Sequence, residues 1–567
     1  MAVEMSKIRV MTANAGSHRQ DLSCDHITTM NFMNLQPIYY RHMVPGEHIK
    51  VDVSAFTRLQ PMAVPTFGRC RMNIRAFWVP FRTVFPQFTS FKSDTYYSDS
   101  SSSAIVTGSP MCQIKDFVTL FVSGSGLSTT GGASATHYDF KVGTTYYLLT
   151  ALGRRYYKIL HSLGYRWEWD DKNTEYVSML ALLSYGKVYC DWYTLSAYLN
   201  SVDFLGLQQL FAYNSPTTPK QLTWQEIFMV LAFVDTVSYD GDWLTAAWDT
   251  PVSPNLSNFT SISWADMTTA NPPSTGSGSV VLDNNGTPVM SQTDATKSYV
   301  GSQYLHNALR KISDYMARHR LSGARDIDRY LVDWGINLDS AKLNRSIYLG
   351  NNSIDIEIGD VMSHADTSTG ALGDYAGRGF GNGSKFFEYD TDEFGLFLIV
   401  ASILPSGGYF QGMDRNNMHL SKYDFFTKDF DSLSCSLISK REVYTGKESF
   451  YTSAAPAASG FGYSNMYYEY KRPLSFVTGD MELDTVNAGK DSWHLMRILN
   501  PSAPTTVVHS AQWCRGIDWE QYNRIFNDTA SSSDKFNVIF HFGVSDQMPG
   551  RSLFEVYDFE DIGKADV

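Results

Sequence analysis

Charged side chains are scarce in this chain of 567 residues. Asp, Glu, Lys and Arg make up 18% of it, against about 25% in an ordinary soluble protein. The 58 acidic and 46 basic residues leave a formal net charge of −12, which argues against a basic protein that coats nucleic acid. Apolar residues reach 43%, enough to build a core, so the low charge does not indicate disorder.

Cysteine is also rare, and no CxxC pair occurs, which argues against zinc-ribbon and thioredoxin-like sites. We expect free thiols in a reducing compartment. The cluster Cys24-Asp25-His26 contains metal-binding residue types, but so few donors are weak evidence for a site. We predict no metal and no cofactor. The six cysteines are Cys24, Cys70, Cys112, Cys190, Cys435 and Cys514.

Long apolar runs are missing as well. The first residues hold no apolar stretch of the kind that a secretory signal needs. No later stretch approaches the roughly 18 uncharged apolar residues of a membrane span. The sequence therefore predicts a protein that is made in the cytoplasm and has no contact with a membrane. It also shows no repeat of fixed period.

Signatures of enzymes are absent: HExxH, GxSxG and the Walker pattern do not occur, and the glycine run at 377–383 does not match GxGxxG. Glu168, Asp170 and Asp171 lie beside tryptophans, and a glycosidase requires two carboxyl groups about 5–10 Å apart. An exposed turn is the other interpretation of that segment. His494 is a candidate base, with a purely structural role as the alternative. We predict no catalytic residue and no enzyme.

Aromatic residues are abundant, at 14% of the chain with 34 Tyr and 34 Phe, and protein interfaces are enriched in such rings. Alternation of apolar and polar residues predicts strands at 72–80 and 538–544, and a continuous apolar run predicts a fully buried strand at 394–400. Further strands are expected around Tyr39, Lys50, Leu437, Tyr468 and His494.

Helical spacing appears in the middle of the chain. It predicts helices over 144–164, after the capping box Thr223-Trp-Gln-Glu226, and over 302–320. We interpret 1–567 as a single β domain with strands mainly in 30–95 and 385–560 and with long insertions. The insertions are a Ser/Gly-rich loop at 98–136, a helical insertion at 144–238, a candidate surface protrusion at 239–301 and a basic helical segment at 302–335.

Four segments in order resemble the major capsid proteins of the Microviridae, the small icosahedral single-stranded DNA phages, and within them the gokushovirus-like branch. They run from Pro37 to Arg82, Asp328 to Ile356, Leu398 to Tyr444 and Glu469 to Leu495, and include the stretches FWVPFR, LNRSIYLG and DSWHL. Each segment alone is weakly specific, whereas the ordered set is strong. The residues that carry the resemblance are Pro45, Gly46, Arg58, Pro80, Arg82, Arg345, Tyr348, Gly350, Tyr470, Pro473, Gly479, Trp493 and His494.

The resemblance implies an eight-stranded antiparallel jelly roll of the viral coat type, with large and partly helical insertion loops. It further implies a structural subunit, found in the virion and assembled in the host cytoplasm. Sixty copies would form a T=1 icosahedral shell around a circular single-stranded DNA genome. An internal scaffolding protein is implied as a partner, and surface loops are expected to contact an unknown host-cell receptor.

Net charge limits what the chain does with DNA, because phosphates are neutralised by Lys and Arg. A subunit at −12 predicts that a separate small basic protein, or polyamines, neutralises most of the genome. Inter-subunit salt bridges are the alternative role for the local basic clusters, and the one we favour. The candidate inner-surface DNA contacts are Arg310, Lys311, Arg318, Arg320, Arg325, Arg329, Arg154, Arg155 and Lys158.

The segment 239–301 resembles, in length and turn composition, the insertion that forms a protrusion at the three-fold axes in gokushovirus-like members. It contains Trp243, Trp248 and Trp264, which would either contact a receptor or pack on symmetry-related copies. Two alternative functions remain open at this point. One is a β-rich carbohydrate-binding protein or glycosidase, and the other is a different phage structural protein such as a receptor-binding fibre.

Overall fold

The computed structural model describes slightly more than half of the chain, and every structural statement below concerns these residues. The longer described ranges are 18–62, 66–93, 108–123, 145–167, 172–193, 202–212, 220–234, 345–359, 378–420, 435–443, 460–472, 475–482, 490–498, 519–528 and 534–548. Short described pieces lie at 97–99, 102–104, 127–129, 140–142, 281–282, 288–289, 311, 424–428 and 431.

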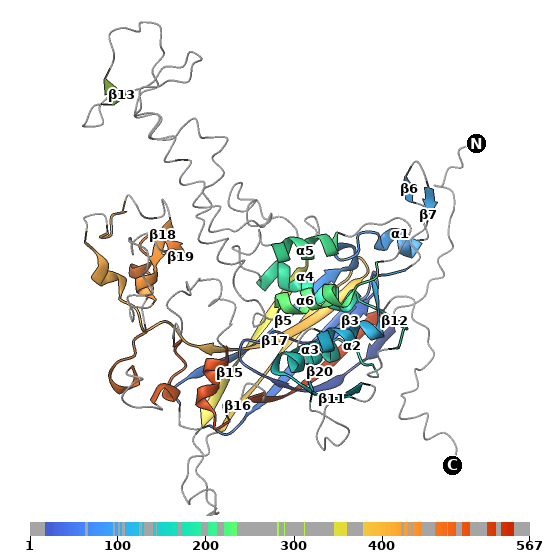
Figure 1. The fold of residues 1–567 in the computed structure, drawn as a ribbon, viewed down its shortest axis with the longest axis horizontal. Helices are drawn as coiled ribbons and strands as arrows, with labels where there is room; N and C mark the ends of the chain where they lie inside the picture. The colour runs from blue at the N-terminus through green and yellow to red at the C-terminus, as the bar shows by residue number, and fades with distance from the viewer. Residues whose placement is uncertain are drawn as a thin grey trace, which may run out of the picture.

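Long antiparallel strands form the centre of the molecule (Figure 1). Neighbouring strands follow the order β1-β20-β4-β16-β15-β5-β17-β3, and β2 also pairs with β20. The strands are β1 (His18–Asp21), β2 (Cys24–Met30), β3 (Gln36–Met43), β4 (His48–Leu59), β5 (Arg69–Pro80), β15 (Ile347–Gly359), β16 (Arg378–Asp390), β17 (Gly395–Ser406) and β20 (Phe536–Met548).

The nine-stranded sheet divides into two halves, because β15 and β16 pair over only three residues at one end. One half is β2-β20-β4-β16, with β1 also paired to β20, and the other is β15-β5-β17-β3. Side chains from both halves meet in one apolar cluster, for example Val51 and Phe540 from the first with Ile74 and Phe397 from the second. The two halves therefore pack face to face as layers around a shared core.

Burial along the strands differs between the layers. Strands β4 and β20 alternate buried and accessible positions, so their half has one face on the core and one face toward solvent. The first nine residues of β17 are all buried, because this strand has the layer of β4 and β20 on one face and helices on the other. The continuous apolar run at 394–400 therefore predicted the buried strand correctly.

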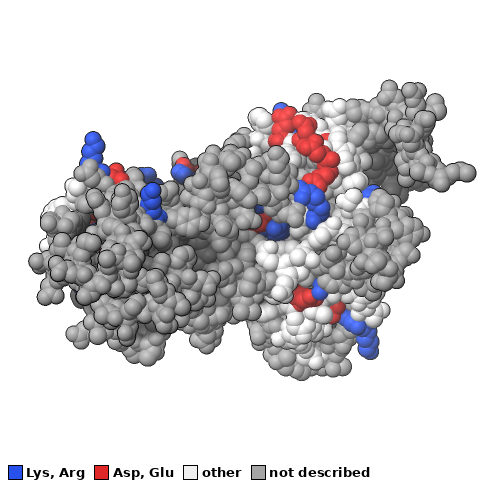
Figure 2. Space-filling model, turned by 90° about the horizontal axis from the view of Figure 1, so that it is seen from above, with Lys and Arg blue, Asp and Glu red and all other residues white. Residues whose placement is uncertain are grey.

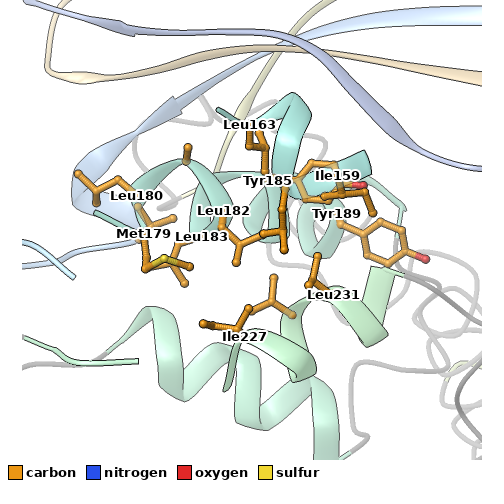
Figure 3. Close-up of a cluster of buried hydrophobic side chains, with 14 of the residues drawn as sticks. Ile159, Leu163, Met179, Leu180, Leu182, Leu183, Tyr185, Tyr189, Ile227 and Leu231 are labelled. Atoms are coloured by element: carbon orange, nitrogen blue, oxygen red, sulfur yellow. The ribbon is translucent and has the colours of Figure 1, made fainter. Parts of the chain in front are cut away.

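Helices cover the outer face of β5 and β17 (Figure 1). In a second apolar cluster, Phe77 and Leu398 of these strands pack with Leu160, Leu183 and Leu231 of three helices. Figure 3 shows Ile227 and Leu231 of one helix facing Leu182 and Leu183 of another. The helices are α1 (Phe88–Ser93), α2 (Ile114–Ser123), α3 (Ala151–Ser162), α4 (Leu180–Val188), α5 (Val202–Phe211) and α6 (Trp224–Val234).

Smaller elements complete the described chain. A π-helix, η3 (Tyr189–Tyr193), follows α4 directly. Short 3₁₀ turns are η2 (Phe81–Thr83), η9 (Arg415–Met418), η11 (Lys440–Glu442), η13 (Tyr468–Tyr470), η14 (Gly479–Met481), η15 (Lys490–Trp493) and η16 (Trp519–Ile525). The small antiparallel sheets are β6 (Tyr97–Asp99) with β7 (Ser102–Ala104), β8 (Met111–Gln113) with β12 (Tyr176–Ser178), β9 (Leu127–Thr129) and β10 (Phe140–Val142) with β11 (Thr145–Leu149), β13 (Val281–Leu282) with β14 (Pro288–Val289), and β18 (Cys435–Ser439) with β19 (Gly460–Asn465).

Several local predictions are confirmed. The backbone N–H of Thr223 donates to Oε2 of Glu226 at 2.9 Å, and α6 begins at the next residue, as the capping box predicts. Gly164 has φ +82° just after the end of α3, in the left-handed region where glycine is favoured. Tyr39, Lys50 and Leu437 lie in β3, β4 and β18.

Other local predictions are wrong. Tyr468 lies in the 3₁₀ turn η13, and His494 follows the turn η15, so neither is in a strand. The helix expected over 144–164 begins only at Ala151, because Thr145–Leu149 pairs with β9 and β10. The 98–136 segment also contains α2, whose buried side chains Phe117, Leu120 and Phe121 anchor it on the helical cluster.

Candidate interaction surfaces

Pro45 and Gly46 form the turn between β3 and β4, with Gly46 at φ +79°. The turn directs Glu47 inward, where its carboxylate accepts hydrogen bonds from the backbone N–H of Val44 at 2.8 Å and from Arg41. Burial raises the pKa of Glu47, and a hydrogen bond with Asp546 raises it further. Arg41 also donates to Asp546 at 2.7 Å. Because Arg41 is on β3 and Asp546 on β20, this buried group ties the two layers together.

Arg345 and the start of β15 are fastened to the π-helix. Oδ2 of Asp191 accepts hydrogen bonds from the backbone N–H and the hydroxyl of Ser346, both at 2.8 Å. Arg345 donates to the backbone carbonyl of Asp191 at 2.8 Å and stacks over the Trp192 ring at 4.0 Å. Lys187 lies 3.2 Å from the same carboxylate. The anchor therefore fixes the point where the chain re-enters the sheet after the long middle insertion.

Other family-signature residues lie in or beside the strands. Pro80 ends β5, and Arg82 after it pairs with Glu393 at 2.8 Å. Arg58 on β4 lies over the Phe56 ring at 5.2 Å. Tyr348 contacts the Phe77 ring, and the register of β15 against β5 shifts between Tyr348 and Gly350. These residues shape the sheet and its ends.

The DSWHL segment is held by an arginine from later in the chain. Arg524 donates to the backbone carbonyls of Asp491, His494 and Met496 at 2.9, 2.7 and 2.8 Å. His494 is buried, which lowers its pKa, and its Nε2 lies 3.2 Å from the Met481 carbonyl. These contacts give His494 a structural role. Trp493 packs on the ring of Phe67, which is 71% exposed.

Tyr470 belongs to a group of rings on the surface. It stacks on the ring of His419, which is also edge-on to Phe425, and it contacts Phe426 at 5.7 Å. Below the rings, His419 lies 3.4 Å from Glu469, whose side chain is 3% exposed. Gly479, another signature residue, opens η14 with φ +70°.

A buried ion cluster continues beneath these rings. Arg415 lies between two carboxylates, 2.9 Å from Glu442 and 3.7 Å from Glu469. Tyr468 donates a hydrogen bond to Glu442. Burial raises the pKa of Glu442. Arg415 offsets part of the charge of the two carboxylates, and the cluster lies beneath the rings and supports them.

The candidate DNA contacts on α3 are in different environments. Lys158 is paired with Asp534 at 2.7 Å and is largely buried, and burial lowers its pKa. Arg155 is also buried, whereas Arg154 is exposed. Lys311 is helical with an exposed side chain. On the face seen in Figure 2, the described basic and acidic side chains lie in small mixed groups and form no continuous basic surface.

Several expected site residues lie outside the described residues. They are Arg310, Arg318, Arg320, Arg325 and Arg329 of the basic segment, Trp243, Trp248 and Trp264 of the protrusion, Pro473, and the carboxylates Glu168, Asp170 and Asp171. Within the described ranges, no three His, Cys, Asp or Glu side chains come together as a metal site. None of the helices in those ranges has the length and apolar character needed to span a membrane.

Comparison with known proteins decides the family. A family model described as "Capsid protein (F protein)" matches residues 8–114 and 252–549, which is more than half of the chain. The chain belongs to this phage capsid family. It is 20% identical to capsid protein VP1 of Bdellovibrio phage phiMH2K over 503 residues, 85% of this chain and 86% of the relative. It is 25% identical to capsid protein VP1 of Chlamydia phage 1 over 205 residues, 35% of this chain and 34% of that relative.

The capsid family match omits residues 115–251, which contain nearly all of α2 and the whole of α3 to α6. It includes every long strand of the two layers. The two layers therefore lie within the part of the chain that the family model matches, and the helices that cover β5 and β17 lie almost entirely in the unmatched part.

Sequence reasoning missed two features of this capsid subunit. The surface rings around His419 and the ion cluster of Arg415, Glu442 and Glu469 were not predicted. A signal was present, since Glu442 and Glu469 both lie within the segments that carry the family resemblance. The sequence did not show that these two segments lie side by side in the folded chain.

Proposed function

We propose that this chain is the major capsid protein of a gokushovirus-like phage, and that sixty copies form a T=1 icosahedral shell around a circular single-stranded DNA genome. The family match and the VP1 relative support a capsid protein that assembles with copies of itself and is located in the virion. The carbohydrate-binding and glycosidase readings find no support in the family match.

We further propose that the eight strands β2 to β5, β15 to β17 and β20 are a viral-coat jelly roll. The observation that carries this is the strand order. Numbering these strands one to eight along the chain, one layer reads 1-8-3-6 and the other 2-7-4-5. Such interleaving of early and late strands in two facing layers is the arrangement that two nested Greek keys produce.

DNA packaging is proposed to rely on partners. The net charge of −12 supports neutralisation of the genome by a small basic protein or polyamines. The burial of Arg155 and the pairing of Lys158 with Asp534 favour structural roles for two of the candidate contacts. The internal scaffolding protein, the receptor and the protrusion at 239–301 stay predictions.

Electron microscopy of purified particles tests the proposal. The chain, expressed together with the other proteins of its phage, is expected to form closed shells of uniform size with icosahedral symmetry and one subunit per asymmetric unit. Nuclease digestion before and after disrupting the shells should show protected single-stranded DNA. Soluble monomers or isolated trimers as the only product would contradict it.

A further inference from the structure

The strongest unassigned feature is a group of exposed apolar side chains between β17 and η14. Leu420 is 93% exposed, Phe425 54%, Phe426 47% and Tyr470 52%. We call these four residues the aromatic patch. Large exposed apolar groups cost free energy in water, and clusters of them on a soluble protein mark interaction sites.

The aromatic patch is built on a rigid base. His419 has a side chain only 6% exposed, contacts the rings of Phe425 and Tyr470, and lies 3.4 Å from the buried carboxylate of Glu469. Phe426 also packs edge-on against Tyr467, which is buried. Since these side chains are already ordered, little conformational entropy is lost when a partner covers them.

The exposed charges beside the aromatic patch are basic, whereas the half-buried carboxylates of Asp424 and Asp431 are engaged with the Leu420 backbone N–H and with Lys471. Lys428 follows Phe426 by two residues, and Arg472 follows Tyr470 by two residues; both are exposed. Two copies meeting patch to patch would bring these like charges together. The patch therefore fits a surface of different composition, with an apolar centre and acidic flanks.

The same chain carries such a surface at the end of β16. Phe386 is 54% exposed there, with Lys50 over its ring at 4.5 Å. The side chains of Glu388 and Asp390 are 48% and 83% exposed, and His48 lies beside both of them, at 3.2 and 2.6 Å. Asp392, in the turn to β17, is also exposed. We call Phe386, Glu388, Asp390 and Asp392 the acidic edge. Three carboxylates against one lysine leave this edge net acidic, so it complements the basic flanks of the aromatic patch, while the half-exposed Phe386 ring offers the apolar contact.

We propose that the aromatic patch of one copy docks on the acidic edge of a neighbouring copy, as one of the contacts that close the shell. A contact between two different surfaces of identical subunits is heterologous, and repeated heterologous contacts generate closed rings. Buried aromatic rings flanked by charge pairs are also the usual composition of the strongest interface positions. This inference rests on the proposed capsid function.

Particle yield tests the contact, with the chain expressed alongside its companion phage proteins and particles separated on a sucrose gradient. The double variant Leu420→Ser, Phe425→Ser is expected to reduce closed particles at least tenfold. Its unassembled form should melt within about 2 °C of wild type, since both side chains are exposed. Ile27→Ser is the matched control, because Ile27 is 77% exposed on β2 and belongs to neither surface.

A charge exchange tests the partner surface. Arg472→Glu and Asp392→Arg should each lower the particle yield, and the two together in one chain should restore it, since each copy then offers the opposite charges to its neighbour. No rescue would refute the acidic edge as the partner.

Other outcomes separate the two proposals. If wild-type chains form closed shells and the patch variant forms them equally well, the contact proposal fails alone. The same holds if particle yield is normal but host attachment is lost, which would assign the patch to a receptor. A loss of particles in Ile27→Ser as large as in the patch variant also refutes it. If wild-type chains never close, the capsid proposal fails and the contact fails with it.

Discussion

Asp191→Ala is expected to be among the most damaging single substitutions outside the sheet core. The carboxylate and Lys187 have side chains only 10% and 9% exposed, and the same carboxylate accepts two hydrogen bonds from Ser346. Removing one partner of a buried ion pair leaves the other charge uncompensated and costs about 3–5 kcal/mol. We add no separate cost for the two lost hydrogen bonds, because the free-energy contributions of interactions that share one side chain are not additive.

The measurement is urea unfolding of the purified unassembled chain followed by circular dichroism, with Asp355→Ala as the control. Asp355 also forms an ion pair, with Arg71 at 2.8 Å, but the two side chains are 72% and 54% exposed. Removing an exposed pair costs about 0–1 kcal/mol. Equal unfolding midpoints for the two variants would refute the argument that burial of the anchor sets its contribution.

A second readout is local. Because Asp191 holds the start of β15, Asp191→Ala should also increase the rate of proteolytic cleavage next to Arg345, and Asp355→Ala should not. The double variant Lys187→Met, Asp191→Leu replaces the ion pair by apolar side chains of similar size. It should recover much of the lost stability, since such replacements are often neutral.

Three further predictions concern the layers and their helices. His161 packs between the rings of Tyr157 and Trp167, and burial lowers its pKa to about 4. In the unfolded chain His161 takes up a proton near pH 6.5, so its contribution to stability is fully present above that pH and is lost as the pH falls toward 4. After a discount for partial exposure, the loss is about 1–2 kcal/mol. The urea midpoint of His161→Gln should not show this pH-dependent loss. Gly164→Ala should lower the melting temperature in a thermal scan, because φ is +82° and the added Cβ would lie 1.9 Å from the Tyr40 hydroxyl oxygen. Phe397→Ala, at a fully buried ring between the layers, should cost about 3–5 kcal/mol in urea unfolding, and a cost near zero would contradict the two-layer core.

Local sequence patterns predicted the strands well where one face is buried. Along β4 and β20, apolar and polar side chains alternate because one face of each strand packs on the core and the other faces solvent. The same reasoning failed at Tyr468 and His494, where short alternating stretches belong to 3₁₀ turns. Those turns are held by contacts such as Arg524 with the DSWHL carbonyls, which no local pattern encodes.

The interaction surfaces were less predictable than the strands. Arg41 and Asp546 form one buried group although they are 505 positions apart, and no local sequence pattern indicates that the two side chains meet. The aromatic patch likewise joins residues 420–426 to residue 470, and exposure of those rings follows only from the fold. Composition did give the correct general expectation, since a chain with few charges and many rings indicates surface that a partner covers.

The place of β20 has a consequence for how the subunit is made. This strand lies between β2 and β4 and pairs with both, yet it begins at Phe536, about 480 residues after β4 ends. At a synthesis rate of about 5–20 residues per second, β20 is synthesised roughly 25–95 s after β4, and the edges of β2 and β4 stay unpaired during that time. During that time the ribosome carries a half-built layer with two open strand edges, the kind that attract other chains. When many copies are translated at once, the late arrival of β20 favours contacts between half-built subunits before each one closes on itself.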